Sequence, residues 1–196
     1  DYSNHIYGDY GLHFDGVDDY VEINNSNLFK NLSSLTFEAV VYINDLGDSA
    51  IGDLIDTRII SDGWVELGYN DSFNPFLWVY DGGTQHYLDS NFIFELNTPY
   101  HVLAGYNNNG MYLYIDGELI TSNQINITSG NRNVNPYIGS RNAGENWRYF
   151  NGRLSEIKIW DSLFSQEDIQ EIIEDENFIS DGLLAHYKFN QGPEGD

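Results

Sequence analysis

Apolar and polar residues alternate in short runs along most of the chain, and this period of two is the pattern of strands with one buried face. The clearest runs are rich in aromatic and β-branched residues and lie at residues 20–23, 35–43, 64–69, 76–80 and 100–106. Gly, Asn and Asp separate them, as expected for turns between strands. Many short strands at this spacing are typical of an antiparallel sandwich, so the sequence predicts an all-β fold.

The segment MYLYIDGELI predicts a β-hairpin. Asp116 and Gly117 separate two arms of alternating apolar residues, and Gly readily adopts the positive φ that a two-residue type I′ turn requires. The segment RLSEIKIW alternates in the same way, so Glu156 and Ile157 are predicted to face opposite sides of one strand. Trp160, which ends this apolar strand, is the clearest candidate for the core.

One helix is predicted, in the C-terminal region. Ser165 begins SQED, a start like a capping box, in which the Ser hydroxyl bonds the backbone amide of Asp168. Isoleucines follow at helical spacing from Ile169, and the helix is expected to end near Asp175. Strand character resumes at residues 182–190, which are predicted to return to a sheet.

The charge balance excludes some partners. The 8 Lys and Arg residues face 31 Asp and Glu residues, for a formal net charge of −23. Such a chain repels a phosphate backbone and an anionic membrane surface, and no apolar run approaches the roughly 20 residues that span a bilayer. We therefore expect no nucleic-acid partner and no membrane insertion. The absence of cysteine excludes disulfides, thiolate nucleophiles and zinc–thiolate sites.

A length of 196 residues fits a single domain, residues 1–196. The chain opens on the polar sequence DYSNHIYGDYG and closes on NQGPEGD, which has the composition of a linker. We expect a domain excised from a larger chain, with other domains of that chain as neighbours.

Four motifs, in order along the chain, carry a family resemblance: GLHFDGVDDYVEI, LTFEAVVYI, MYLYIDGELI and YIGSRNAGENWRYFNGRLSEIKIWDSLFSQEDIQEI. Together they resemble the laminin-G-like, or concanavalin A-like, jelly-roll family. The resemblance implies a two-sheet antiparallel jelly-roll sandwich with one short helix in the C-terminal region. Ligands of such folds usually meet the concave face or the rim loops. Because one fold hosts many functions, the resemblance does not by itself decide this one.

Acids in the first motif suit a hard cation. The turn DGVDD offers several carboxylate and carbonyl oxygens, and Ca²⁺ takes six to eight oxygen ligands. The alternative is ordinary turn chemistry, in which Asp and Gly are common. The resemblance implies a structural Ca²⁺ that joins this turn to the last long strand, with the terminal strand as a further source of oxygen. The candidate metal ligands are Asp15, Gly16, Glu156 and Asn190.

The resemblance also extends to glycan-cleaving enzymes, which place clustered carboxylates on one strand. The strand glutamates here are Glu38, Glu66, Glu118 and Glu156. None has an acidic partner two positions away, which is what sharing one strand face requires. Asp53 and Asp56 are three positions apart and are predicted to point to opposite faces of an extended strand. Acids paired across strands keep a glycan hydrolase or lyase open as an alternative, but we predict a protein without catalytic residues.

Aromatic residues indicate a binding surface. In FLWVY, Phe76, Trp78 and Tyr80 lie on one face of the predicted strand. Leu77 and Val79 lie on the other, so one face suits the core and the other a groove. Aromatic rings pack on the apolar faces of sugars while nearby polar groups bond the hydroxyls. Core packing is the alternative for each of these rings.

The loop GSRNAGENWRYF combines donors, acceptors and an aromatic ring, and it holds two of the 8 Lys and Arg residues. An ordinary solvated connection is the alternative. The candidate ligand-binding residues are Trp78, Tyr80, Arg141, Asn142, Asn146, Trp147 and Arg148.

The sequence thus favours a non-catalytic, lectin-like module that binds carbohydrate and is stabilised by Ca²⁺. We expect it in a secreted or surface-displayed adhesin or polysaccharide-processing protein. A spacer domain without a ligand is the structural alternative, beside the enzymatic one.

Overall fold

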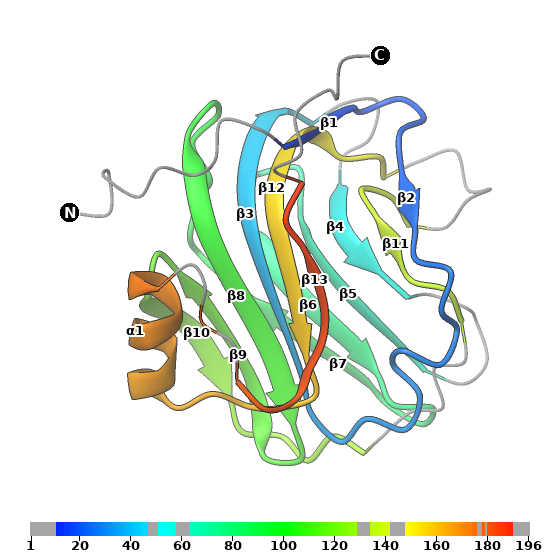
Figure 1. Cartoon of the computed structure of the whole chain (residues 1–196), viewed down its shortest axis with the longest axis vertical. Helices are drawn as coiled ribbons and strands as arrows, with labels where there is room; N and C mark the ends of the chain where they lie inside the picture. The colour runs from blue at the N-terminus through cyan, green and yellow to red at the C-terminus, as the bar shows by residue number, and fades with distance from the viewer. Residues whose placement is uncertain are drawn as a thin grey trace.

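Two antiparallel sheets stack face to face in the computed structural model (Figure 1), which describes residues 11–46, 51–57, 63–128, 134–141, 148–175, 178 and 180–189. Within these ranges the chain forms 13 strands and one helix. The all-β sandwich with a short C-terminal helix is therefore confirmed. No helix in the described part of the chain combines the length and the apolarity of a membrane span.

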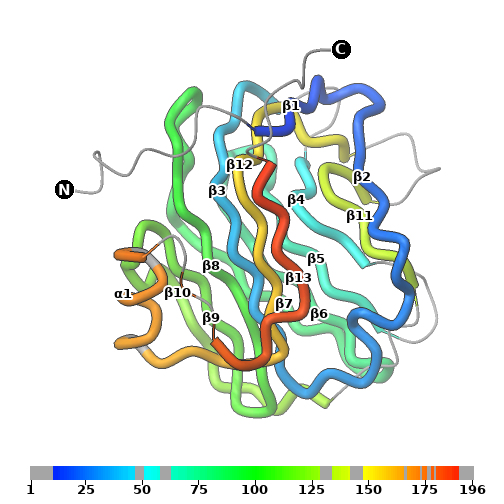
Figure 2. The backbone as a smooth tube through the Cα atoms, viewed as in Figure 1, coloured from blue at the N-terminus to red at the C-terminus, as the bar shows by residue number. Residues whose placement is uncertain are grey.

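The first sheet has seven strands. They are β1 (Leu12–Asp15), β12 (Asn151–Trp160), β3 (Leu35–Asp45), β8 (Pro99–Asn107), β9 (Gly110–Ile115), β10 (Glu118–Asn123) and β13 (Leu183–Tyr187). Along one side β12 pairs with β3, and along its other side it pairs first with β1 and then with β13. The segment predicted to return to a sheet thus does so, and Figure 2 shows β13 beside β12.

The second sheet has six strands in the order β2-β11-β4-β5-β6-β7. Their bounds are β2 (Val21–Glu22), β11 (Tyr137–Ile138), β4 (Gly52–Asp56), β5 (Trp64–Tyr69), β6 (Pro75–Tyr80) and β7 (Gln85–Asp89). We call the side of this sheet that faces away from the first sheet the outer face.

Alternating side chains build the core between the sheets. Leu77 and Val79 of β6 are fully buried there, as are Val65 of β5 and Val102 of β8. Phe76 does not belong to this cluster although it is also buried. The two sides of β6 therefore meet different surroundings, as its sequence predicted.

The helix α1 (Gln166–Glu174) begins as predicted. The Ser165 hydroxyl accepts a hydrogen bond from the amide of Asp168, whose carboxylate accepts from the Ser165 amide. Ile169 packs with Trp160 in a small cluster of its own, on the outside of the seven-stranded sheet. Trp160 is fully buried, as predicted, but in this cluster under α1 and not between the sheets.

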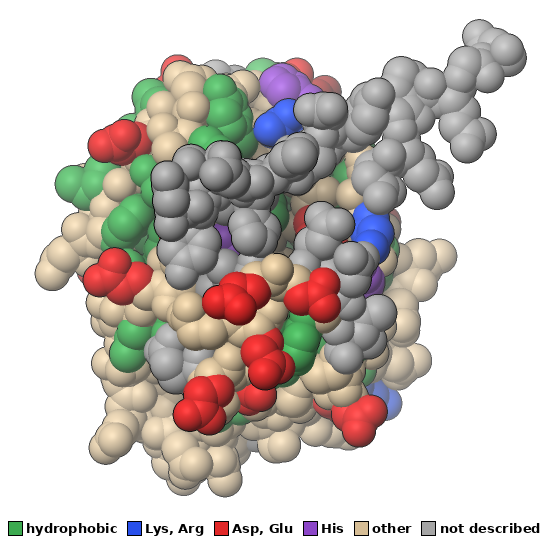
Figure 3. All heavy atoms as spheres, turned by 60° about the vertical axis from the view of Figure 1, so that its left-hand side comes forward, with side chains coloured by type: hydrophobic (Ala, Val, Ile, Leu, Met, Phe, Trp, Pro, Cys, Tyr) green, Lys and Arg blue, Asp and Glu red, His purple; other side chains and the backbone are tan. Residues whose placement is uncertain are grey.

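Acidic side chains spread over the face that carries α1 (Figure 3). Glu167, Glu171 and Glu174 of the helix are exposed. They form a solvated helix face, and the helix dipole favours Glu167, which lies in the first turn.

The predicted hairpin joins β9 to β10. Asp116 has φ 49° and Gly117 has φ 79°, both in the left-handed region that a type I′ turn requires. This prediction is confirmed.

A chain of ionisable side chains crosses β8, β3, β12 and β13. The buried Glu38 accepts from Lys158 Nζ at 3.2 Å and lies 2.9 Å from His101 Nε2. Lys158 Nζ also lies 3.7 Å from Glu156, which pairs with His186. Burial raises the pKa of Glu38, but His101 and Lys158 outweigh it and lower that pKa below its ordinary value. Opposite charges thus compensate one another inside the sheet.

Replacing Lys158 with Met tests this chain of charges. Lys158 is fully buried, and removing one partner of a buried ion pair leaves the other charge uncompensated, at a cost of about 3–5 kcal/mol. Urea unfolding of Lys158→Met is expected to show this loss. Lys30→Met, at an exposed lysine, should change stability by less than about 0.5 kcal/mol. Equal stability of the two variants would contradict the assignment.

Asp81 fastens the turn after β6. Its carboxylate accepts from the amides of Gly83 and Thr84, from Thr128 and from His86. Burial raises the pKa of Asp81, but these bonds outweigh it and hold that pKa far below its ordinary value of 3.8. Because the folded pKa is the lower one, this stabilisation is complete above pH 3.8 and is lost as the pH falls towards the folded pKa.

Asp81→Asn is therefore expected to lower the free energy of unfolding at pH 7 and to reduce its dependence on pH below 4. Unfolding measured in urea at several pH values between 2.5 and 7 checks this. If wild type and variant lose stability in parallel below pH 4, Asp81 does not carry the effect.

Candidate functional site

Six residues form a continuous row across the outer face, one from each strand. In spatial order they are Glu22 (β2), Tyr137 (β11), Asp56 (β4), Glu66 (β5), Trp78 (β6) and Tyr87 (β7). We call them the cross-strand row. Neighbouring strands lie about 4.8 Å apart, so the row is roughly 24 Å long. It brings acids and aromatic rings together from strands that are far apart in sequence.

Trp78 on β6 and Tyr87 on β7 form the aromatic end of the row, and Trp64 and Tyr80 lie beside it on β5 and β6. Trp78 and Tyr80 are half-buried on the outer face, where the sequence predicted them, and Tyr87 is 47% exposed. The ring of Trp64 lies 4.5 Å from that of Tyr80 and 6.0 Å from that of Trp78, centroid to centroid. Trp78 meets Tyr87 edge to face at 5.7 Å. Contacts of this kind hold the rings in fixed orientations and leave part of their surface open.

Two acids of the row, Asp56 and Glu66, form a cluster of three buried carboxylates with Asp53, which lies beside the row. Asp53, Asp56 and Glu66 are each 0% exposed, and their carboxylate oxygens lie within 4.8 Å of one another. The prediction that Asp53 and Asp56 point to opposite faces is wrong. The pairing of β4 with β5 shifts between Asp53 and Ile55, and Leu54 and Ile55 are both in the core. This β-bulge turns both aspartates to the outer face.

Arg148 supplies positive charge to these acids. Its guanidinium donates to Glu66 and lies 3.9 Å from Asp53. The backbone of Arg148 is also held, because its carbonyl accepts from the Asp53 amide at 3.2 Å. Arg148 is 6% exposed, so its side chain is buried with these acids and does not project into solvent. Its predicted contact with a ligand stays a prediction.

The other loop candidates divide into two groups. Arg141 is half-buried just after β11. Asn142, Asn146 and Trp147 lie outside the described residues, and so does Asn190.

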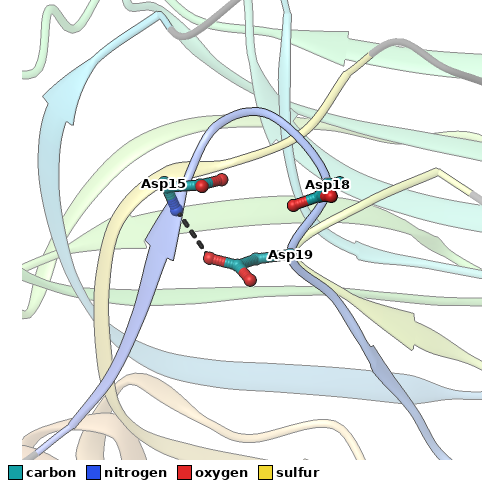
Figure 4. A group of neighbouring side chains, drawn as sticks. All are labelled: Asp15, Asp18 and Asp19. Carbon is teal, nitrogen blue, oxygen red and sulfur yellow. Dashed lines mark hydrogen bonds between the residues drawn. The ribbon is translucent and has the colours of Figure 1, made fainter.

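The first turn gathers three carboxylates (Figure 4). Oxygens of Asp15, Asp18 and Asp19 lie within 4.8 Å of one another and turn towards the space that the turn encloses. The Asp19 carboxylate accepts from the Asp15 amide at 2.9 Å, and that of Asp15 accepts from the Val17 amide at 2.8 Å. Gly16 adopts φ 81°, which requires the freedom of glycine. This geometry is compatible both with an ordinary turn and with a cation site.

Glu156 does not join this turn. Asp15 pairs with Asn151 at the start of β12, and Glu156 lies five positions further along the strand, or roughly 16 Å away. Its carboxylate instead meets His186 and Lys158. The predicted ligands Asp15 and Glu156 therefore lie apart, because β1 pairs with the first residues of β12 and Glu156 follows them.

An open groove lies beside β10 and the segment that follows β7. It measures about 450 Å³, and its lining residues include Phe92, Ile93, Glu95, Asp116 and Glu118. No residue predicted from the sequence as a ligand contact lines it.

Comparison with known proteins places the fold. The family model of laminin G-like domains, described as the Concanavalin A-like lectin/glucanases superfamily, matches residues 15–170. Among curated protein sequences, none matches this chain at a significant level.

Three solved structures illustrate the similarity. A Bacteroides ovatus protein proposed to bind carbohydrate has a TM-score of 0.72 and 18% identity, over 93% of this chain and 52% of that one. A native heptameric SAP-like pentraxin from Limulus polyphemus has a TM-score of 0.67 and 14% identity, over 85% of this chain and 82% of that one. The CBM40 of Ruminococcus gnavus IT-sialidase, bound to α2,3 sialyllactose, has a TM-score of 0.67 and 15% identity, over 84% and 96%.

At these identities the solved structures establish the fold, which the two sheets described above share. The family match covers most of the chain in sequence. The chain therefore belongs to the laminin G-like family of the concanavalin A-like lectin/glucanase superfamily.

Proposed function

We propose that the chain binds carbohydrate reversibly on the outer face, as a non-catalytic module. The observation that carries this proposal is the cross-strand row, which sets Trp78 and Tyr87 beside carboxylates on one face. Sugar rings offer apolar faces to aromatic side chains and hydroxyls to acids and amides. The carbohydrate-binding proteins among the structural neighbours support the same class of ligand.

A spacer without a ligand explains this face less well. Tyr87 is 47% exposed and Trp78 is only half-buried, so both leave apolar ring surface in water that a binding partner would cover. The aliphatic residues of the same strands are in the core. A binding face requires aromatic rings whose surface is partly exposed on one side of a sheet, and the outer face has them.

Glycan hydrolysis is the second candidate, and one observation favours it. A retaining glycosidase needs two carboxyl groups about 5–5.5 Å apart, and the oxygens of Asp53, Asp56 and Glu66 lie within 4.8 Å of one another. These acids are 0% exposed, and Arg148 donates to Glu66. A buried carboxylate held by arginine cannot reach a glycosidic bond, so we favour binding. Release of reducing ends from polysaccharides, abolished in Asp56→Asn, would reverse this preference.

We also propose a structural Ca²⁺ at the turn of Asp15, Gly16, Asp18 and Asp19. The convergence of three carboxylates in this turn supports it, because Ca²⁺ prefers oxygen ligands. Glu156 is not part of this set. In our proposal the chain acts in a secreted or surface-displayed protein, alongside other domains.

Truncation of the aromatic end of the row tests binding. Trp78→Ala should reduce the affinity for a neutral oligosaccharide found on a glycan array by at least tenfold, because aromatic residues at the centre of a binding face commonly contribute about 2 kcal/mol or more. Leu163→Ala, at a residue that is 42% exposed and lies just before α1, should leave affinity unchanged. Calorimetric titration compares the variants, and Trp78→Phe is expected to recover part of the loss. Wild-type affinity in Trp78→Ala would remove Trp78 from the site.

Calcium is tested by thermal unfolding. Binding to the folded state alone adds about 2.7 kcal/mol when free Ca²⁺ exceeds Kd a hundredfold, which corresponds to roughly 5–10 °C for a domain of this size. The midpoint should therefore fall by this amount when a chelator is added. Asp18→Asn should lose the response, whereas Asp71→Asn, at an exposed turn aspartate, should keep it. If the chelator does not change the unfolding midpoint of the wild type, the turn does not hold a well-occupied Ca²⁺ site.

A further inference from the structure

We infer that the outer face selects uncharged glycans and discriminates against glycans that carry carboxylate or sulfate groups. The inference rests on the proposed carbohydrate binding and adds the class of ligand. It follows from the placement of charge along and beside the cross-strand row.

Among the described residues of the outer face, carboxylates outnumber cations. The carboxylates belong to Glu22, Asp53, Asp56, Glu66 and Asp89. The arginines are Arg148, whose guanidinium is engaged with Glu66, and Arg141, at the edge of the face after β11. An anionic ligand on this face therefore meets an excess of like charge.

The two exposed acids lie at opposite sides of the face. Asp89 lies two positions after Tyr87 on β7, so both side chains project from the same side of the strand. Glu22 on β2 pairs with Tyr137 at the far end of the row. A sugar that extends along the row from Trp78 in either direction thus approaches an exposed carboxylate. Two like charges about 4 Å apart repel each other even in water, by an amount that corresponds to about fivefold in affinity.

The pKa values of two tyrosines on the face, Tyr87 and Tyr137, are raised near the same acids. Burial, followed by the charges of Asp89 and Glu66, raises the pKa of Tyr87 to about 12, while Arg148 opposes this only in part. Burial, followed by Glu22, also raises the pKa of Tyr137. A negative charge on a phenol oxygen is therefore disfavoured at both ends of the row. A ligand carboxylate or sulfate placed there would lose hydration in the same way and lie near the same carboxylates.

Similarity of fold does not carry the ligand of a neighbour to this chain. The CBM40 neighbour was solved with sialyllactose, which is anionic, but shares only 15% identity with this chain. The inference rests on the charge of the outer face, which is negative over its described residues.

Binding to matched glycan pairs tests the inference. The probes are neutral oligosaccharides on an array, each with its sialylated and its sulfated counterpart, followed by titration of the strongest neutral probe and its charged forms. The wild type should bind the neutral member at least fivefold more tightly than the charged members. The double variant Glu22→Gln, Asp89→Asn should lower this ratio towards one, because it removes the two exposed carboxylates of the face. Raising the salt concentration should narrow it as well, since salt screens exposed charges.

The control is Glu167→Gln, Glu171→Gln, which makes the same change of charge on exposed acids of α1, on the other sheet. This control should keep the wild-type ratio. Equal or tighter binding of charged members by the wild type would overturn the inference and leave carbohydrate binding intact. If the control narrows the ratio as much as the double variant, overall charge and not the outer face is responsible, and the inference fails. Binding of no probe, neutral or charged, would overturn the proposed function itself.

Discussion

Three carboxylates buried side by side must be compensated, because an uncompensated charge in a protein interior costs several kcal/mol. On the outer face, where Asp53, Asp56 and Glu66 lie together, Arg148 supplies part of this compensation, because it donates to Glu66 and lies near Asp53. The interaction ties the chain just before β12 to β4 and β5, which are distant in sequence. It also sets the character of the face, because it places negative charge next to aromatic rings.

The same arrangement favours the proposed binding over catalysis. Carboxylates at this spacing would suit a glycosidase if they were open to substrate. Here they are buried and Arg148 donates to Glu66, whereas the rings of Trp78 and Tyr87 remain partly open. The surface that a ligand meets is therefore aromatic and flanked by acids. In the proposed binding mode a sugar rests on these rings, and the three acids of the cluster stay buried.

Local patterns in the sequence predicted the elements well. The Asp116-Gly117 turn, the capping box of Ser165 and the two faces of β6 all formed as expected, because each depends on residues close together in sequence. The bulge in β4 was missed. Its signal is the pair of apolar residues between two aspartates in DLID, since two adjacent core residues cannot alternate regularly.

The pairing between distant strands was harder to predict. The expected meeting of Asp15 with Glu156 depended on the register of β1 against β12, and Asp15 pairs with Asn151 instead. No local pattern determines such a register. Trp160 shows a related limit, because its burial was predicted but its packing under α1 depends on where the helix lies. The cross-strand row likewise exists only once six strands are aligned.

The most direct measurement follows the side-chain N–H signals of the tryptophans by NMR while a neutral oligosaccharide is added. Binding on the outer face predicts that the Trp78 signal shifts with the ligand and saturates, while the signal of Trp160, buried under α1, stays in place. The result that would contradict it is an unchanged Trp78 signal together with shifts of backbone amides in the groove beside β10, such as those of Ile93 and Glu118.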